Sequence, residues 1–383
     1  MLNDMRKVLR FTLAICCLTV FQTVCGAQEK KEIISNAYDV VLQQTQGSYT
    51  PDFKVDGKDT KVRNIILMIG DGMGLGAAAN AYFANGKELT MMNLKTKGYV
   101  CTQSASDFIT DSAASGTAYA TGQKTTNGYV GMDVNQQPVK NLPEKLAPLG
   151  YACGVVSTDD LHGATPASFF AHQNERGASQ EIWEDLPGCF LTFASAGTKG
   201  YFENLPLSDQ EAIKKTFTLV YSPDDPAVRT SSRLIYLPES VKYEERGNYL
   251  PATTEMAINY LSSKSKKGFF LMVEGARIDK EEHGNNAAGV VRETLDFDKA
   301  IEAAVRFAEK DGHTLVVISA DHETGTTAIR NAVLEENTVQ VLFSSKGHSG
   351  IMVPLYAYGP KSWNFEGIQE NSDVSNKIYN ILK

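Results

Sequence analysis

The segment Asn64-Ile-Ile-Leu-Met-Ile-Gly-Asp-Gly72 gives the strongest indication of the architecture. Its apolar run at residues 65–69 has no polar face and is too short for a typical helix. Such runs are typical of strands that are buried on both faces of a parallel sheet. The run stops at Gly70, so we expect a turn there that presents Asp71 at the carboxyl end of the strand.

Four further apolar runs have the same character, at residues 151–156, 268–273, 314–318 and 353–358. Between the third and the fourth of the five, residues 295–310 place their apolar side chains largely on one face, and Asp311-Gly312 ends the pattern. A helix between two strands is the crossover that parallel strands need. The sequence therefore predicts an α/β fold, with a central, mostly parallel sheet and helices on both of its faces.

Composition limits the partners of the chain. Its 383 residues are 42% hydrophobic and 21% charged, with a net charge of -8. This acidity argues against a nucleic acid or an anionic membrane as partner, since both attract clustered Lys and Arg. A phosphate-bearing substrate is still compatible, because metal ions and one Arg can make a single site locally positive.

The first residues resemble an export signal. Three basic residues precede an apolar run at 11–21 that is too short to span a bilayer, and Cys25-Gly26-Ala27 offers small residues for cleavage. We therefore predict a signal peptide at 1–27, a periplasmic or secreted protein, and no stable membrane insertion after cleavage. An uncleaved anchor helix and a lipoprotein acylated at Cys25 are the alternatives.

The rest of the chain is predicted to be an arm or linker at 28–60, followed by one large domain at 61–383. Residues 192–249 are weakly periodic and are interpreted as an insertion or cap over the site. After cleavage the chain keeps three cysteines without a CxxC spacing, which predicts no thiolate metal site and leaves one disulfide open. These cysteines are Cys101, Cys153 and Cys189.

Reactive residues follow four of the predicted strands. Asp71 follows the first, residues 159–165 the second, Glu274 the third and Asp321-His322 the fourth. Open parallel sheets place their sites at the carboxyl ends of their strands. A carboxylate or His after several strands therefore indicates a metal cluster, whereas one acidic residue after one strand would indicate nothing.

Histidine is scarce, with six in the chain, and three of the six have acidic neighbours or a Gly-flanked loop. Asp279 and His283 are four residues apart and share a face if they are helical. Asp321 and His322 are adjacent, and His348 lies in the loop. Any one of these His alone would more often be a packing residue. Together with the carboxylates they suit Zn²⁺, with oxygen donors left for Mg²⁺.

Asp111-Ser112 is followed by small residues up to Ala118. This pattern predicts a tightly packed helix start, where backbone N–H groups favour an anion near Ser112. A plain N-cap is the alternative. No Gly-x-Ser-x-Gly pattern surrounds Ser112, so a Ser-His-Asp hydrolase is not indicated. A metal ion can activate such a serine instead.

Four separated motifs together resemble the alkaline phosphatase family. They are residues 64–74, residues 110–117, Val273-Glu-Gly-Ala-Arg-Ile-Asp279 with His283, and Ser319-Ala-Asp-His-Glu-Thr-Gly325. They occur in the family's order and cover the chain from about residue 61 to its end.

The resemblance implies a phosphomonoesterase that forms a covalent phosphoserine, with two Zn²⁺ ions and one Mg²⁺ ion, and releases inorganic phosphate. Ser112 would be the nucleophile, and Arg176 would bind the phosphate of the substrate. Asp71 would bridge one zinc and the magnesium. The other implied ligands are Asp321 and His322 on that zinc, Asp279, His283 and His348 on the second zinc, and Thr165 and Glu274 on the magnesium.

One position departs from the family pattern. Where the family carries Asp or His two residues before Thr165, this chain has Gly163, with His162 and Asp160 close by. The third site is therefore weaker or completed by His162 after a local shift, and Lys280 could act on the phosphate or the third cation through water. Whether that cation is Mg²⁺ or another zinc is open.

Two rival functions remain. A phosphodiesterase or phosphonate hydrolase of the same superfamily would share the metal ligands, but Arg176 and a third cation favour the monoester dianion. A non-catalytic phosphate or metal-binding protein would need a lost nucleophile or ligand, and none is evident. The physiological substrate and the oligomeric state are open, and a homodimer is the assembly we consider.

Overall fold

The computed structural model describes residues 37–383 of the chain. The predicted signal peptide at 1–27 and the first part of the predicted arm lie outside the described residues. Among residues 37–383, no helix has both the length and the apolar character that a membrane crossing requires.

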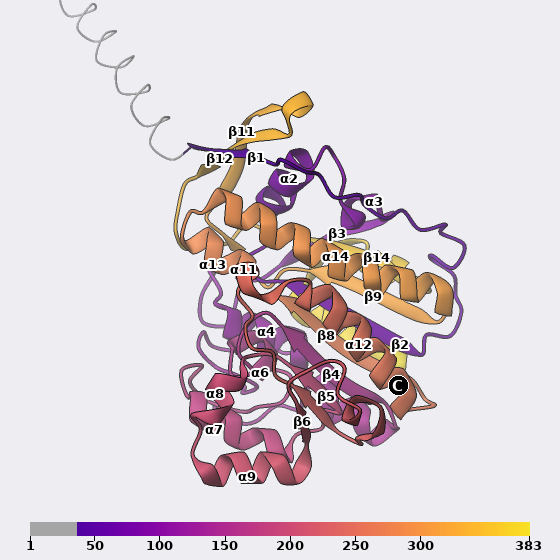
Figure 1. Ribbon diagram of the computed structural model, residues 1–383. Helices are drawn as coiled ribbons and strands as arrows, with labels where there is room; N and C mark the ends of the chain where they lie inside the picture. The colour runs from indigo at the N-terminus through magenta and orange to yellow at the C-terminus, as the bar shows by residue number, and fades with distance from the viewer. Residues whose placement is uncertain (1–36) are drawn as a thin grey trace, which may run out of the picture.

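A ten-stranded sheet forms the centre of the molecule (Figure 1). Adjacent strands in this sheet run parallel to each other, except that β14 runs antiparallel to both β3 and β9. All five predicted strands are present, and the predicted α/β fold with a mostly parallel sheet is confirmed. In sheet order the strands are β15 (Gly367–Glu370), β3 (Thr96–Cys101), β14 (Val353–Tyr358), β9 (Thr314–Ser319), β2 (Asn64–Gly70), β8 (Phe269–Gly275), β4 (Ala152–Ser157), β5 (Phe193–Ser195), β7 (Leu234–Tyr236) and β6 (Thr218–Val220).

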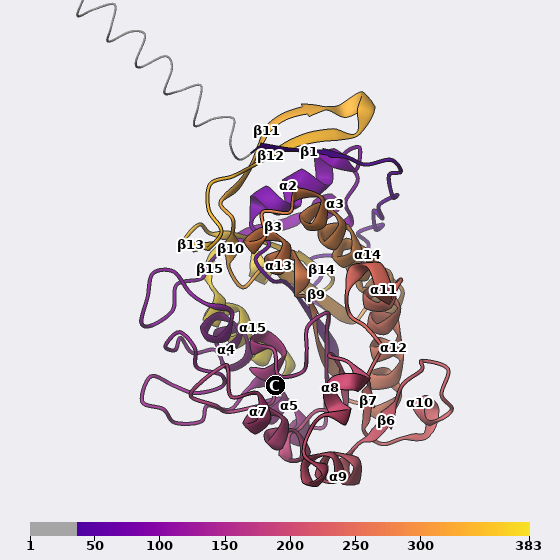
Figure 2. The same cartoon turned by 60° about the vertical axis from the view of Figure 1, so that its left-hand side comes forward.

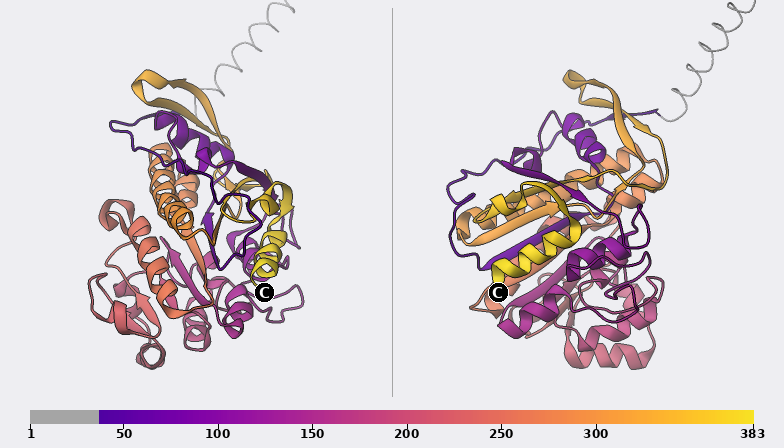
Figure 3. Two further views of the ribbon diagram at one scale, coloured as in Figure 1. Left: turned by 90° about the vertical axis from the view of Figure 1, so that its right-hand side faces the viewer. Right: turned by 180° about the vertical axis from the view of Figure 1, so that it is seen from behind.

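Helices cover both faces of this sheet. Helices α12 (Tyr249–Lys264) and α14 (Ala287–Asp311) pack on one face, against β4, β8 and β9. Helices α4 (Ser112–Thr121), α6 (Ala164–Ala167) and α15 (Asn371–Leu382) cover the other, as the view from behind in Figure 3 shows. The strands between the two layers are fully buried, which explains their uninterrupted apolar runs.

Helix α14 contains the predicted helix 295–310 but begins earlier. The side chain of Asn286 accepts a hydrogen bond from the backbone N–H of Gly289 and caps the first turn. Gly312 ends the helix with φ 73°, a left-handed conformation that favours glycine.

Shorter elements surround this core. The remaining helices are α2 (Leu75–Ala84), α3 (Thr90–Asn93), α5 (Leu142–Leu146), α7 (Ser179–Asp185), α8 (Lys199–Glu203), α9 (Leu207–Thr216), α10 (Ala227–Thr230), α11 (Tyr243–Arg246) and α13 (Arg277–His283). A small sheet of β1 (Ala37–Val41), β12 (Thr338–Phe343) and β11 (Thr327–Val333) projects at one end of the molecule (Figure 2). A second one pairs β10 (Glu323–Thr324) with β13 (His348–Ser349).

Two predicted segments have more structure than their sequences suggested. Residues 37–41 of the arm form β1, which pairs with β12. Residues 192–249 add β5, β7 and β6 to one edge of the large sheet. Each of these strands has only three residues, too few to produce a readable hydrophobic period.

The register of the central strands defines the position of the site. Ile69 of β2 lies beside both Glu274 of β8 and Ser319 of β9, and Glu274 lies beside Ser157 of β4. The four strands therefore end at one level, and the residues that follow them meet at one edge of the sheet.

Candidate active site

At this edge the structure brings together the residues that were predicted to bind zinc. Two groups have ligand atoms that all lie within 4.8 Å of one another. One group is Asp279, His283 and His348, and the other is Asp71, Asp279 and His322. Asp279 belongs to both groups, so its carboxylate lies between the two positions.

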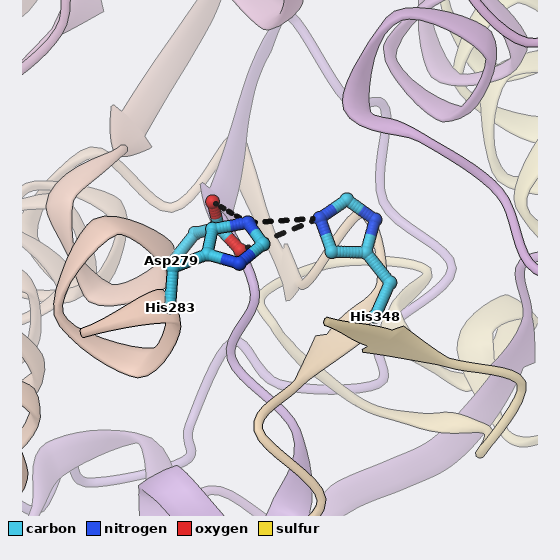
Figure 4. Close-up of side chains that lie close together, drawn as sticks. All are labelled: Asp279, His283 and His348. Carbon is cyan, nitrogen blue, oxygen red and sulfur yellow. Dashed lines mark hydrogen bonds and ion pairs between the residues drawn. The ribbon is translucent and has the colours of Figure 1, made fainter. Parts of the chain in front are cut away.

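Helix α13 and strand β13 build the first group (Figure 4). Asp279 and His283 lie one turn apart on α13, and His283 Nε2 is 3.2 Å from Asp279 Oδ2. His348 reaches in from β13, with its Nε2 atom 3.7 Å from Asp279 Oδ1 and 3.3 Å from His283 Nε2. Two imidazole nitrogens and one carboxylate thus point toward a common centre.

The second group lies deeper, at the ends of β2 and β9. His322 Nε2 is 3.5 Å from Asp71 Oδ1 and 3.2 Å from Asp321 Oδ2. Asp321 and His322 are fully buried, and Asp71 is 8% exposed. Asp321 therefore borders this group, beside the residues with which it was predicted to act.

The tautomers of His283 and His348 leave a lone pair on each Nε2 atom. His283 Nδ1 lies 2.5 Å from the carbonyl oxygen of Lys346, and His348 Nδ1 lies 2.9 Å from that of Thr110. Because a carbonyl oxygen only accepts, each Nδ1 carries the proton, and the neutral rings present lone pairs to each other at Nε2. Only a shared proton or a cation can satisfy this arrangement.

Thr324 fixes the tautomer of His322 in the same way. The Thr324 hydroxyl donates its proton to Asp279 Oδ1 over 2.6 Å, so it accepts from His322 Nδ1 at 3.1 Å. His322 Nε2 then faces carboxylate oxygens without a proton of its own. Asp71 Oδ1 and Asp321 Oδ2 are buried and have no hydrogen-bond partner among residues 37–383. Acceptors that face one another without donors fit a bound cation.

The electrostatics of the protein alone point the same way. Burial raises the pKa of Asp71 well above its usual range, and the negative charges of Asp321 and Asp279 add to the shift. Burial and the charge of Asp279 raise the pKa of Asp321 to about 7. The hydrogen bond between His283 and Asp279 raises the pKa of His283 to about 9. The centre therefore retains protons in positions where a metal cation could replace them.

Ser112 is the first residue of α4 and lies against the second group. Its Oγ atom is 3.2 Å from His322 Nε2, and the residue is 4% exposed. The Asp111 side chain caps the helix by accepting from the Ala114 N–H over 2.9 Å. The remaining backbone N–H groups of this first turn favour an anion beside the Ser112 hydroxyl.

Arg176 lies at the exposed side of the same helix start. Its guanidinium Nη1 donates to Asp111 Oδ2 over 3.0 Å, and the backbone N–H of Gly128 donates to the same oxygen over 3.1 Å. Arg176 stands in a turn, with its backbone N–H bonded to the Gly128 carbonyl. Asp111 thus holds the helix start and the arginine together.

The predicted magnesium ligands lie on the sheet side of the site. Glu274 is 1% exposed, and it accepts a hydrogen bond from the Ser157 hydroxyl. Burial and then the charge of Asp159 raise its pKa to about 8. The Thr165 hydroxyl is buried and has no hydrogen bond of normal geometry within the described part of the chain. These oxygen donors fit a hard cation such as Mg²⁺.

The contacts of His162 are with aromatic side chains, and neither Glu274 nor Thr165 is among its hydrogen-bond partners within residues 37–383. Its Nδ1 atom accepts from Trp183 Nε1 over 3.3 Å, and its ring stacks on Tyr201 with centroids 4.4 Å apart. The structure therefore does not support the alternative that His162 completes the third site. His172 and His313 also lie elsewhere, bonded to Gly131 and Lys61 respectively.

Two residues of the site carried no readable signal in the sequence. Asp111 looks like an ordinary N-cap, and its contact with Arg176 depends on a residue 65 positions away. Thr324 is one hydroxyl in a polar turn, and its contact with Asp279 spans 45 positions. The three described cysteines, by contrast, are free thiols and lie apart from the site.

Comparison with known proteins agrees with this arrangement. The sequence model described as "Alkaline phosphatase" matches residues 62–199, 240–340 and 326–383. Alkaline phosphatase 4 of Bacillus subtilis is 29% identical over 84% of this chain and 89% of its own length. Alkaline phosphatase H of Pseudomonas aeruginosa is 30% identical over 82% and 84%.

A solved structure shares the fold as well. The alkaline phosphatase from the Antarctic bacterium TAB5 superposes with a TM-score of 0.79 and 34% identity, covering 85% of this chain and 99% of its own. A mutant of that enzyme has been solved with Mg bound in its M3 site.

Proposed function

This chain belongs to the alkaline phosphatase family, and from that premise we propose that it hydrolyses phosphate monoesters through a covalent phosphoserine at Ser112. Family and fold make it a phosphomonoesterase. The nucleophile, the metal ions and the role of each residue are our proposal, and the geometry around Ser112 supports them.

Three side chains would hold each of two Zn²⁺ ions. Asp279, His283 and His348 form one set, and Asp71, Asp321 and His322 form the other. Bound zinc supplies positive charge to the oxygen atoms that become negative during phosphoryl transfer and lowers the pKa of water. When His283 gives up its second proton, the Nε2 lone pairs of His283 and His348 face each other, and this arrangement favours a metal ion.

Ser112 carries out the first displacement. Its Oγ atom forms a bond to phosphorus while the bond from phosphorus to the ester oxygen breaks, and the alcohol leaves from the opposite side. The hydroxyl proton of Ser112 is lost to solvent and the alkoxide of the alcohol regains one. The first-turn N–H groups of α4 face the negative charge that the phosphoryl group brings.

Water carries out the second displacement. Its oxygen bonds to phosphorus, the bond from phosphorus to Ser112 Oγ breaks, and inorganic phosphate departs with the serine restored. In both steps the planar guanidinium of Arg176 can donate to two phosphoryl oxygens at once. Asp111 accepts a hydrogen bond from Arg176 and caps the helix that begins with Ser112, so it is a positioning residue.

The single observation behind this proposal is the 3.2 Å contact between Ser112 Oγ and His322 Nε2 inside a cluster of buried carboxylates. Acid quenching during turnover of a phosphate monoester, followed by peptide mass spectrometry, should find the phosphoryl group on Ser112. Label on any other residue would refute the assignment. Faster hydrolysis of diesters than of monoesters would instead favour the hypothesis that the protein is a phosphodiesterase.

We propose Mg²⁺ as the third cation. Glu274, Thr165 and Asp71 offer oxygen donors only, which Mg²⁺ prefers. The mutant TAB5 enzyme with Mg in its M3 site supports this choice. Element analysis of the purified protein should find magnesium in addition to zinc, whereas a third zinc ion would contradict it.

Export and self-association remain predictions. The basic and apolar N-terminal pattern supports a cleaved signal peptide and a periplasmic or secreted location. Sequencing of the mature N-terminus should start at Gln28, and a retained Met1 would contradict cleavage. Light scattering on the purified protein would show whether the considered homodimer forms.

A further inference from the structure

Gly163 is a glycine for a reason of space. Its φ of -55° and ψ of 143° are open to any residue, so the backbone conformation does not require glycine. A Cβ atom built on Gly163 would lie 2.6 Å from Asp159 Oδ2, 2.9 Å from the backbone carbonyl oxygen of Asp160 and 3.0 Å from Asp159 Cγ. The carboxylate of Asp159 therefore occupies the space into which a side chain at position 163 would project.

The position of this carboxylate is fixed by its neighbours. The Lys280 ammonium pairs with Asp159 Oδ1, which leaves Oδ2 as the oxygen over Gly163. The backbone N–H of Asp159 donates to Ser157 Oγ over 2.8 Å, and the same hydroxyl donates to Glu274. One serine thus links the segment that carries Asp159 to the predicted magnesium ligand Glu274.

An unsatisfied donor atom lies on the same side of the site. Thr165 is 1% exposed, and its hydroxyl has no partner of normal geometry among residues 37–383. Thr165 follows Gly163 by two positions at the start of α6. The negative charge of Asp159 also acts on the buried Glu274. A buried hydroxyl without a partner, close to two carboxylates, points to a cation.

We propose that Asp159 supplies the carboxylate that position 163 lacks, and that it completes the third cation site together with Thr165 and Glu274. Gly163 provides the space for it, and Lys280 orients it. This inference rests on the proposed function, but it concerns the third cation alone. A site built from carboxylate and hydroxyl oxygens selects Mg²⁺, since it offers no imidazole to attract zinc.

A reciprocal exchange of side chains tests this proposal. The variants are Asp159→Ala, Asp159→Asn, and the double variant Asp159→Ala with Gly163→Asp. Asp160→Asn is the matched control, because it removes a neighbouring carboxylate whose side chain is not among the atoms closest to Gly163. Zinc-loaded protein is dialysed against a series of Mg²⁺ concentrations, and bound magnesium and zinc are measured by element analysis.

We expect one Mg²⁺ per wild-type chain. Asp159→Ala and Asp159→Asn should each weaken Mg²⁺ binding at least about tenfold, with the zinc content unchanged. The double variant should recover part of the lost affinity, because the Asp160 carbonyl oxygen still limits the space at position 163. Asp160→Asn should match the wild type. The gain in melting temperature on Mg²⁺ addition should follow the same order.

Three results would overturn the proposal. They are a wild-type chain that binds no magnesium, an Asp159→Ala variant with wild-type affinity, and a double variant that binds no better than Asp159→Ala. The first result would indicate that the Lys280 ammonium replaces the cation. In all three cases an intact zinc content and phosphorylation of Ser112 would leave the proposed phosphoserine mechanism standing, so failure of the third cation site and failure of that mechanism can be distinguished.

Discussion

The Nε2 atoms of His283 and His348 face each other at 3.3 Å, while the Nδ1 atom of each ring lies against a backbone carbonyl oxygen. Two neutral rings in these tautomers present lone pairs to one another. In the metal-free protein a proton on His283 relieves the contact, consistent with a pKa raised to about 9 mainly by Asp279. A metal ion would displace that proton and bind all three side chains.

The nucleophile assignment predicts the effect of Ser112→Ala. Because no other described hydroxyl contacts His322 Nε2 at hydrogen-bond distance, turnover of a phosphate monoester should fall at least about 1000-fold. The zinc content should stay the same, since the Ser112 hydroxyl is not required to hold the ions. Ser106→Ala, in an exposed loop, is the control and should keep full activity. Near-wild-type turnover in Ser112→Ala would refute the mechanism.

Asp111→Asn separates capping from the positioning of Arg176. Asn caps a helix about as well as Asp, so the melting temperature should change little. The charged partner of Arg176 is lost, and one charge-assisted hydrogen bond of about 1 kcal/mol corresponds to roughly a fivefold rise in KM. Steady-state kinetics on a monoester would measure it. An unchanged KM together with a large drop in stability would show that Asp111 acts only as a cap.

Thr324→Val tests the hydroxyl between His322 and Asp279. The substitution keeps the shape of the side chain but removes both hydrogen bonds, so His322 is free to adopt the other tautomer. Hydrogen bonds to metal-binding residues typically change metal affinity by about 10- to 100-fold, and we expect a loss of this size in chelator competition. Thr338→Val, on the small projecting sheet, is the control and should bind zinc normally. Equal affinities in both variants would contradict this role.

The stability of the metal-free protein should fall as the pH rises. Glu274 and Asp321 have pKa values raised to about 8 and about 7 by burial, so these two carboxyls bind more protons in the folded chain than in the unfolded chain between about pH 4 and 8. They outnumber the buried His322, whose lowered pKa acts in the opposite direction. The raised pKa of His283 acts in the same direction up to about pH 9. Under this linkage, stability decreases with pH across that window.

Thermal unfolding of chelator-treated and zinc-loaded protein between pH 5 and 9 would measure this effect. The melting temperature of the metal-free form should drop with pH more steeply than that of the loaded form, because bound cations compensate the carboxylates. A metal-free melting temperature that rises steadily toward pH 9 would contradict the electrostatic account of the site.

The parts of the fold and of the site that could be predicted from the sequence are those that depend on local patterns in the chain. The strands around Ile69 and Val317 are continuous apolar runs, so both they and their α/β order were readable. The convergence of Asp71 and Asp321 followed from one rule, that parallel strands end at the same edge of a sheet. These local and topological signals were sufficient for the central sheet and the cluster of ligands.

Other features depend on contacts that a single sequence does not encode visibly. The strands of 192–249 are too short for a period, and β14 has the apolar character of its parallel neighbours although it runs antiparallel. Gly163 appeared to be a missing ligand. Only the structure shows that the Asp159 carboxylate fills the space beside it. A carboxylate that takes the place of another in this way is brought there by packing between loops, and such packing leaves no periodic pattern in the sequence.

Two metal ions should lie next to Ser112, and anomalous X-ray diffraction at the zinc edge from zinc-loaded crystals would locate them. We expect two strong peaks close to Asp279, one among Asp279, His283 and His348, and one among Asp71, Asp321 and His322 beside Ser112 Oγ. Zinc peaks confined to other parts of the molecule, or a single peak remote from Ser112, would rule out this arrangement.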